Sequence, residues 1–315
     1  MVNGVAKRRS GAKGAAWFML RRDATFHRVV PMASSFRLIG SDHPHGLPES
    51  PVVLSVPHAG RDYPLALRAA LRAPLASLAA LEDRHVDAIA LAARERETLL
   101  LQIAPRAWID LNRAEHERDP LLDDGAGGGT RGASLSAKVR AGLGLVPRRT
   151  AHAGELWRRR LAGDEVEARI VADHRPYHVA LGETLARARA RFGTAVLLDI
   201  HSMPPIAGGR ARIVLGDRFG RAAAARFVHR MEAVLEAERL SYALNTPYAG
   251  GHILERHGRP HEGVHAIQLE IDRSLYLDQR LDAPGPGLAA VTRLVRSLID
   301  ALADEAATSL SEAAE

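Results

Sequence analysis

The composition of this chain excludes several classes of protein. Its 315 residues, of which 46% are hydrophobic and 25% charged, are typical of a globular protein and exclude a collagen-like or disordered chain. The sequence contains no cysteine, so any transition metal must be held by His, Asp or Glu. The longest apolar runs, such as Thr194–Leu198, fall far short of the ~20 residues that a membrane helix needs, and we expect no membrane-spanning segment.

The positive charge is concentrated at the N-terminus. The net charge of +6 suggests nucleic-acid binding. However, residues 1–31 contain seven of the 43 basic residues and one of the 37 acidic residues, so the rest of the chain has 36 basic and 36 acidic residues. The apolar run Ala16–Leu20 is too short for a secretory signal, and we expect a cytoplasmic protein. A transit peptide or a nucleic-acid arm is an alternative, but we interpret residues 1–35 as a basic, disordered extension and 36–315 as the folded domain.

Predicted strands and helices alternate along the chain. Apolar and β-branched runs predict strands at 51–57, 99–103, 107–111, 194–200, 212–215 and 264–271. Apolar residues at helical spacing predict helices at 75–96, 219–239 and 288–307, and a helical region at 155–191 that is broken near Gly163 or Pro176. This order predicts a single α/β domain with a mixed, mostly parallel sheet and helices on both faces.

Two histidines stand where predicted strands end. His58 follows the first strand and His201 ends the most apolar one, and in such sheets ligands bind beyond the carboxyl ends of the strands. Asp199 lies on the same side of its strand as His201, where it can ligate a metal or fix the imidazole tautomer. Other histidines are interpreted as surface or capping residues, namely His43, His45, His116, His152, His229 and His257.

These two histidines predict a metal site. A catalytic zinc usually has three protein ligands and an open fourth position, of which His58 and His201 supply two. The acidic segment 82–87 offers four candidates for the third ligand on one predicted helix, and their spacing does not choose among Glu82, Asp83, His85 and Asp87.

Two further polar positions are candidates for catalysis and binding. Gln268 and Glu270 share one face of a strand whose other face is entirely apolar. A carboxylate there is either half of a buried ion pair or a general base, and a nearby metal favours the base. Arg113, at the end of another predicted strand, either clamps a substrate carboxylate or forms a surface salt bridge.

Seven motifs in consistent order carry a family resemblance. They begin at Ser55, Glu82, Ile109, Asp199, Val214, Asn245 and Val264 and read SVPHAG, EDRHVD, IDLNR, DIHSMP, VLGDRFG, NTPYAGG and VHAIQLEI. Together they resemble the N-formylglutamate amidohydrolase (deformylase) family over residues 51–278. The resemblance implies a zinc-dependent amide hydrolase with a fold similar to the zinc carboxypeptidases and the succinylglutamate desuccinylases. It further implies release of formate from N-formyl-L-glutamate, a step of histidine degradation.

The resemblance also implies the metal ligands and the base. One zinc ion per chain is expected on His58, Asp83 and His201, although another divalent metal is an alternative. Glu82 is the nearest rival of Asp83. The related peptidases have a glutamate ligand where this sequence has Arg61, so the carboxylate ligand must come from elsewhere. Glu270 takes the place of the general base.

Substrate-binding residues follow from the same resemblance. The pair Asn112–Arg113 resembles the pair that holds the substrate carboxylate in the related peptidases. A dianionic substrate needs a further cation, for which Arg210 or Arg212 is a candidate. Tyr248, Gly250 and Gly251 are expected in a turn where the backbone approaches the substrate closely.

Two other functions stand beside this hypothesis. The same metal chemistry could act on another N-acyl amino acid, because the motifs indicate the reaction better than the substrate. A non-catalytic protein that binds nucleic acid or a membrane surface through its basic tail is the less favoured alternative.

Overall fold

The computed structural model describes Met1 and residues 35–40, 48–127, 135–206, 208 and 211–312. The extension that we predict over residues 1–35 therefore lies outside the described residues, apart from Met1 and Ser35. Among the helices that the structure describes, none has the length and apolar character needed to cross a membrane.

A seven-stranded mixed sheet with the order β1-β3-β2-β6-β9-β7-β8 forms the centre of the fold. Strands β3, β2, β6 and β9 run parallel to one another, and β7 runs parallel to β8. By contrast, β1 runs antiparallel to β3, and β7 runs antiparallel to β9. The predicted α/β class with a mixed, mostly parallel sheet is therefore confirmed. The strands are β1 (Phe36–Ile39), β2 (Val52–Val56), β3 (Thr98–Gln102), β6 (Ala195–Met203), β7 (Ile213–Gly216), β8 (Tyr242–Leu244) and β9 (Val264–Asp272), and a separate small sheet pairs β4 (Arg149–Thr150) with β5 (Gly154–Glu155).

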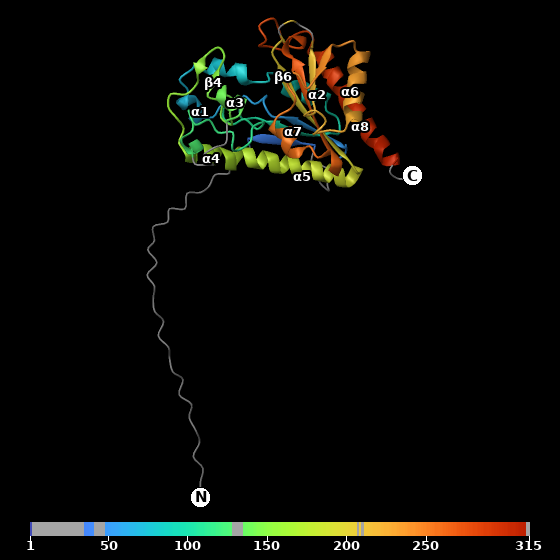
Figure 1. Ribbon diagram of the computed structural model, residues 1–315, viewed down its shortest axis with the longest axis horizontal. Helices are drawn as coiled ribbons and strands as arrows, with labels where there is room; N and C mark the ends of the chain where they lie inside the picture. The colour runs from blue at the N-terminus through green and yellow to red at the C-terminus, as the bar shows by residue number, and fades with distance from the viewer. Residues whose placement is uncertain (2–34, 41–47, 128–134, 207, 209–210, 313–315) are drawn as a thin grey trace. The chain divides into compact units, whose positions relative to one another are not determined.

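Helices cover both faces of this sheet (Figure 1). One face packs against α2 (Val86–Ala93), α6 (Ala225–Ala237) and α8 (Leu288–Glu312), and the other against α5 (Arg175–Phe192) and α7 (His252–His257). The shorter helical segments are α1 (Leu65–Ala70), η1 (Leu75–Leu81), η2 (Asp124–Gly127), α3 (Ala137–Arg140), α4 (Gly163–Arg169), η3 (Ile170–His174), η4 (Pro260–Glu262) and η5 (Arg273–Leu275).

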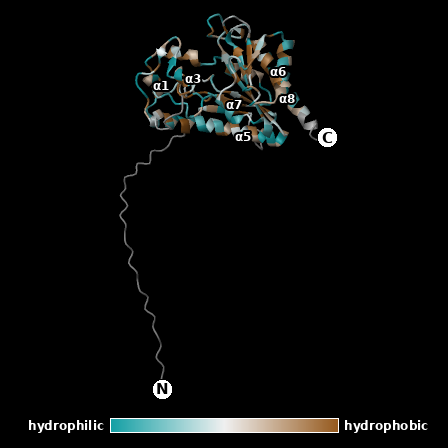
Figure 2. Cartoon of the chain, viewed as in Figure 1, coloured by the Kyte–Doolittle hydropathy of each residue, from teal (hydrophilic) through white to brown (hydrophobic). Residues whose placement is uncertain are grey.

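Alternation along the buried strands produces two cores. In β6, Val196, Leu198 and Ile200 belong to the core on the α2, α6 and α8 side, whereas Leu197 belongs to the core on the α5 side. Asp199, two residues after Leu197, shares that second face. The helix α5 buries one face, since its buried residues, among them Tyr177, Leu181 and Ala188, recur at helical spacing, and Figure 2 shows hydrophilic and hydrophobic residues along it. Asp199 and His201, near the end of β6, are thus directed to the α5 and α7 side of the sheet.

The helix predicted at 75–96 is interrupted. Its first part, η1, is a 3₁₀-helix, and α2 begins only at Val86. The residue before it, His85, has a left-handed φ of 61°. In the break, the Asp83 N–H donates to the His58 carbonyl at 2.9 Å. This tertiary hydrogen bond takes Asp83 out of the helical ladder and places it beside the loop that follows β2.

Two other predictions of secondary structure were wrong. Residues 107–111 form turns instead of a strand, and the Asp110 N–H donates to the Leu145 carbonyl of a neighbouring loop at 2.8 Å. The helix expected from residue 155 begins at Gly163, because the preceding residues bond to other loops. From there α4 continues through a π-helical turn, η3, into α5, and the shifted ladder accommodates Pro176 in the first turn of α5.

Candidate active site

The polar residues of three parallel strands meet at the carboxyl edge of the sheet. Ser55 of β2 is paired in register with Asp199 of β6, and His201 of β6 with Glu270 of β9. His58 lies two residues beyond the end of β2. Since parallel strands end on the same edge, residues that are far apart in the sequence come together here.

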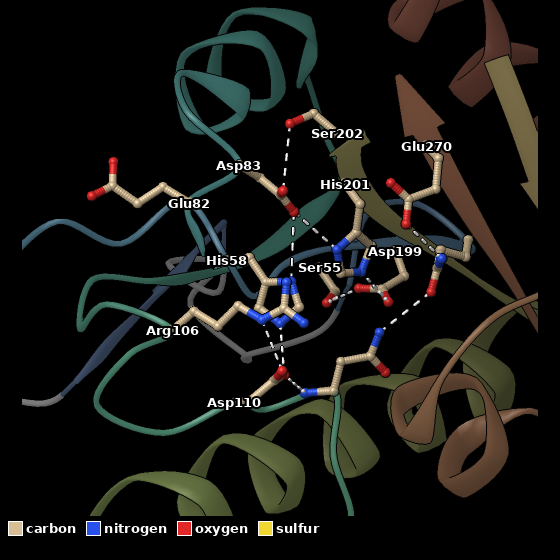
Figure 3. Close-up of polar contacts among 12 residues, drawn as sticks. Ser55, His58, Glu82, Asp83, Arg106, Asp110, Asp199, His201, Ser202 and Glu270 are labelled. Carbon is tan, nitrogen blue, oxygen red and sulfur yellow. Dashed lines mark hydrogen bonds and ion pairs between the residues drawn. The ribbon is translucent and has the colours of Figure 1, made fainter. Parts of the chain in front are cut away.

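His58, Asp83 and His201 form a buried group whose nitrogen and oxygen atoms converge (Figure 3). Asp83 Oδ2 lies 3.0 Å from Nδ1 of His201 and 3.5 Å from Nδ1 of His58. One ligand atom from each residue lies within 4.8 Å of the other two. Two imidazole nitrogens and a carboxylate oxygen at these separations match the ligand types of a zinc site.

Each histidine of this group is held by a second carboxylate. His58 Nε2 donates to Asp110 Oδ1, and His201 Nε2 donates to Asp199 Oδ2, both at 2.8 Å. Asp199 in turn accepts a hydrogen bond from the Ser55 hydroxyl at 2.6 Å. A proton on each Nε2 directs the Nδ1 atoms toward Asp83, which is the arrangement that orients imidazole ligands in metal sites.

The electrostatics keep these carboxylates ionised. Burial opposes the charged form of Asp110, but Arg106 and Arg113 outweigh it and hold the pKa of Asp110 well below its usual range. Burial likewise opposes ionisation of Asp83, and hydrogen bonds from His201 and His58 outweigh it, so its pKa is also well below the ordinary value. Both carboxylates are therefore charged at neutral pH.

The segment 82–87 places only Asp83 at the cluster. The Glu82 side chain points away from it in Figure 3 and pairs with Arg84 at 3.2 Å. His85 contacts the Asp282 carbonyl, and Asp87 pairs with Arg61 at 2.6 Å. The break before α2 thus brings Asp83, alone among the four sequence candidates, to the cluster.

Glu270 lies beside the cluster with one strong hydrogen bond. Its Oε1 accepts from Gln268 Nε2 at 2.8 Å, and both side chains are buried. Burial raises the pKa of Glu270 to about 7, and the charge of Asp83 adds to the rise while His201 opposes it. A carboxyl group that titrates near neutrality can both take and return a proton.

The cluster lines a cavity of about 410 Å³. Most of the residues predicted from the sequence line it, and the turn after β8 contributes Tyr248, Gly250 and Gly251. A Cβ at Gly251 would collide with the Asn112 side chain, which explains a glycine at this position. The lining residues with chemical character are His58, Asp83, Arg106, Asn112, Arg113, Lys138, His201, Ser202, Tyr248, Gln268, Glu270 and Arg273.

The predicted substrate-binding residues have different surroundings. Asn112 is engaged by the protein, since its Oδ1 accepts from the Ile253 N–H at 2.9 Å and its Nδ2 donates to Gln268 at 3.3 Å. Arg113 is buried and fixed by the carbonyls of Leu143 and Asn112.

Of the two candidates for a second cation, only Arg212 is described, and it does not line this cavity. Arg212 is ion-paired with Asp272 at 2.9 Å and is absent from the described lining. Arg210 lies outside the described residues.

Four residues of the site were missed by sequence reasoning. Asp110 belongs to a quoted motif, but only the fold shows that it holds His58. Arg106 pairs with Asp110 at 2.8 Å, and Arg273 with Asp83 at 3.2 Å. Lys138 of α3 lines the cavity, and its side-chain ammonium has no hydrogen-bonded or ion-paired partner among the residues that the structure describes. No spacing in the sequence indicated Lys138, because α3 is a four-residue helix in a long irregular region.

An α/β sheet that presents buried histidines, an ionised carboxylate and a carboxyl group of raised pKa at its strand ends is a framework suited to hydrolysis. Comparison with known proteins agrees. The model of the N-formylglutamate amidohydrolase family matches residues 50–277, and the chain belongs to this family.

Several relatives support this assignment. The N-formylglutamate deformylase of Pseudomonas aeruginosa is 32% identical over 264 residues, which cover 80% of this chain and 92% of that protein. The N-formylglutamate deformylase of Pseudomonas putida is 30% identical, with 79% and 92% covered. A crystal structure of N-formylglutamate amidohydrolase from Ralstonia eutropha superposes with a TM-score of 0.75 at 32% identity and covers 86% of this chain and 98% of that one. A gene product of Agrobacterium tumefaciens shares the fold, with a TM-score of 0.57 at 19% identity, and covers 89% of this chain and 97% of that one.

Proposed function

We propose that this protein hydrolyses N-formyl-L-glutamate to L-glutamate and formate, with a zinc ion held by His58, Asp83 and His201. The observation that carries the proposal is the convergence of these three side chains beside Glu270, in a chain whose relatives are named N-formylglutamate deformylases. The family supports the hydrolysis of a linear amide, and the donor set supports the metal.

The residues fit a zinc ion by their chemistry. The two imidazoles keep their Nε2 protons on Asp110 and Asp199, so that both Nδ1 atoms face the Asp83 oxygen. Once His201 releases its Nδ1 proton, the donor set has two imidazole nitrogens and one anionic oxygen, which suits zinc better than magnesium or calcium. When bound, such an ion would polarise the formyl carbonyl and make water more acidic.

Glu270 moves the proton. The attack of water on the formyl carbon releases a proton, and the cleavage of the C–N bond requires one on the departing nitrogen. Glu270, with a pKa raised to about 7 by burial, accepts the first proton and delivers it to the amine. Gln268 keeps the carboxyl group in place by its hydrogen bond to Oε1.

The cations of the cavity suit a substrate with two carboxylates. Arg106 and Arg273 are already paired with Asp110 and Asp83. Arg113 is fixed at Nε and Nη1, and its Nη2 has no hydrogen-bonded partner within the described part of the chain. Lys138 is unpaired there too. We assign one substrate carboxylate to Arg113, as the sequence predicts, and the second to Lys138 in place of Arg210 or Arg212.

Formate release from N-formyl-L-glutamate tests the proposal directly. The full-length protein is assayed as purified, after chelation and after addition of zinc, with N-acetyl- and N-succinyl-L-glutamate alongside. We expect formate release that is lost on chelation and restored by zinc. Hydrolysis of an analogue without formate release would show that the same site acts on another N-acyl amino acid. Full activity after exhaustive chelation would refute the requirement for a metal.

A further inference from the structure

A second group of histidines lies between α5, α7 and the segment 111–113. His174, His178 and His252 each place a ring nitrogen within 4.8 Å of those of the other two. His174 and His178 are four residues apart, at the junction of the π-helical turn and α5, and His252 is the first residue of α7. A pair of histidines at this spacing on one helical face is a common source of two metal ligands.

The hydrogen bonds show which nitrogens keep a free lone pair. His174 Nε2 donates to the Arg113 carbonyl at 2.8 Å, and His178 Nε2 donates to the Leu111 carbonyl at 3.0 Å. A carbonyl only accepts, so both Nε2 atoms carry the proton and both Nδ1 atoms carry the lone pair. His174 Nδ1 is buried without a hydrogen-bond partner among the described residues, and the same holds for both nitrogens of His252.

An orphaned nitrogen on a buried ring needs an explanation. The His174 side chain is fully buried, with 0% of its surface exposed, so bulk water does not satisfy its Nδ1. The nearest acidic atom, Glu115 Oε1, lies 3.8 Å away, beyond hydrogen-bond length, and Glu115 is itself paired with Arg175. An unsatisfied group of this kind costs stability, and a bound ion would satisfy it.

The imidazoles are neutral, as metal ligands must be. Burial lowers the pKa of His174 and of His178, and burial together with His174 lowers that of His252 to about 4. The nearby Arg256 acts in the same direction on all three, while Glu115 opposes it at His174 and His252. At neutral pH the group therefore offers lone pairs without first losing protons.

We propose that His174, His178 and His252 bind a second divalent transition-metal ion of the zinc class, separate from the one at His58, Asp83 and His201. Imidazole nitrogens select zinc, cobalt, nickel or copper, whereas magnesium and calcium require oxygen ligands. The competing partner of His178 Nδ1 is His257 Nε2, 3.0 Å away, which the ion displaces from that lone pair.

The role of this ion is structural. The carbonyls held by His174 and His178 flank Asn112, whose side chain binds the Ile253 N–H next to His252. An ion at the three histidines ties α5 to α7 and to the segment that presents Asn112 and Arg113 to the cavity. None of the three histidines is among the described residues that line the cavity, so the ion takes no part in bond cleavage.

Metal stoichiometry and thermal stability of the full-length, tag-free protein test the proposal. Chelated protein is titrated with zinc and, for the visible spectrum of the bound ion, with cobalt. We expect two equivalents per chain in the wild type and one in His252→Phe, which keeps a ring and breaks none of the hydrogen bonds described here. A matched control is His261→Phe, because His261 is 78% exposed, and it should keep two.

The thermal readout distinguishes a bound ion from a purely structural histidine network. At a hundredfold excess over Kd, zinc at this site should raise the Tm of His201→Ala, which lacks the first site, by about 5 °C. The double variant His201→Ala/His252→Phe should lose that rise while keeping the same metal-free Tm. Two equivalents in His252→Phe, or an unchanged zinc effect in the double variant, would overturn the proposal. Failure of the first site alone would lower the wild-type stoichiometry without altering the effect of His252→Phe.

Discussion

The cavity and the second histidine group, His174, His178 and His252, place the same type of side chain in opposite electrical surroundings. In the cavity, His58 and His201 donate to the buried carboxylates Asp110 and Asp199 (Figure 3). In the second group, His174 and His178 donate to backbone carbonyls. Burial opposes protonation in both regions, but Asp199 and Asp83 raise the pKa of His201 well above its ordinary value, whereas the pKa of His178 is well below it.

The difference shows that the partner of an imidazole, more than its burial, sets its chemistry. All four rings are nearly inaccessible to solvent. A carboxylate behind the ring makes it a basic, strongly oriented ligand, while a carbonyl leaves it neutral and weakly basic. The cavity is therefore the region suited to hydrolysis, and the second group is suited to a structural role.

The largest effect that tests this contrast is expected from Glu270→Gln. The variant keeps the shape of the side chain but removes the proton carrier of the cavity, so we expect turnover to fall about 10³-fold. Zinc content should remain that of the wild type, because Glu270 is not among the ligands. Turnover and bound zinc are measured on the same preparation, and wild-type turnover would remove Glu270 as the base.

Sequence reasoning predicted the layout of the cavity better than that of the second group. The apolar run of β6 and the strand-ending positions of His58 and His201 are local signals, and the alternation of β9 correctly put Gln268 and Glu270 on one face. By contrast, His257 was interpreted as a surface or capping residue, yet it is 7% exposed and bonds to His178.

The remaining features depended on contacts that no local pattern encodes. Asp83 was one of four candidates until the break before α2, held by a hydrogen bond to the His58 carbonyl, placed it at the cluster. Asp110 and Lys138 come from irregular segments whose positions are set by long-range packing. Periodicity predicts regular elements, and it carries no information about such loops.

The second prediction concerns Asp199, the carboxylate that accepts a hydrogen bond from His201. Asp199→Asn keeps the size of the side chain but removes the charge that accepts from His201 Nε2. We expect a loss of about 10–100-fold in zinc affinity, and a similar fall in turnover at limiting zinc.

A buried carboxylate that contacts no histidine of the cavity provides the control. Asp173 is buried and accepts a hydrogen bond from Trp108 Nε1 at 2.6 Å. Asp173→Asn should leave zinc affinity within about twofold of the wild type, a much smaller change than the loss of about 10–100-fold expected for Asp199→Asn. Equal affinities for Asp199→Asn and Asp173→Asn, measured by competition with a chelator, would contradict the role of the carboxylate.

The third prediction concerns the unpaired cation of the cavity. Lys138→Met removes the charge and keeps the aliphatic stem, and loss of a charged hydrogen bond to a substrate carboxylate should raise KM for N-formyl-L-glutamate about 10-fold or more. Because Lys138 does not touch the reacting bond, kcat should change little. Arg140→Met is the matched control, because Arg140 belongs to the same short helix and is not among the described residues that line the cavity. An unchanged KM in Lys138→Met would reassign the second carboxylate.

The smallest expected effect tests whether a buried imidazole without a carboxylate partner stays neutral, and it uses a histidine that belongs to neither group. His265 of β9 is 2% exposed and its Nδ1 accepts from the Ala224 N–H at 3.2 Å, next to the start of α6. Burial lowers its pKa to about 4, from an ordinary value of 6.5, and Arg226 acts in the same direction.

The sign of the pH dependence follows from this depressed pKa. The unfolded chain binds a proton below pH 6.5 and the folded chain does not, so the contribution of His265 is fully present above pH 6.5 and is lost as the pH falls toward 4. Between pH 7.5 and 6 the free energy of unfolding should decrease by about 1 kcal/mol more in the wild type than in His265→Gln, whose amide oxygen accepts the same hydrogen bond without titrating. Urea unfolding of both proteins at the two pH values measures this difference directly. Parallel pH profiles would mean that the ring is protonated in the folded protein, and burial without a carboxylate would then not be enough to keep an imidazole neutral.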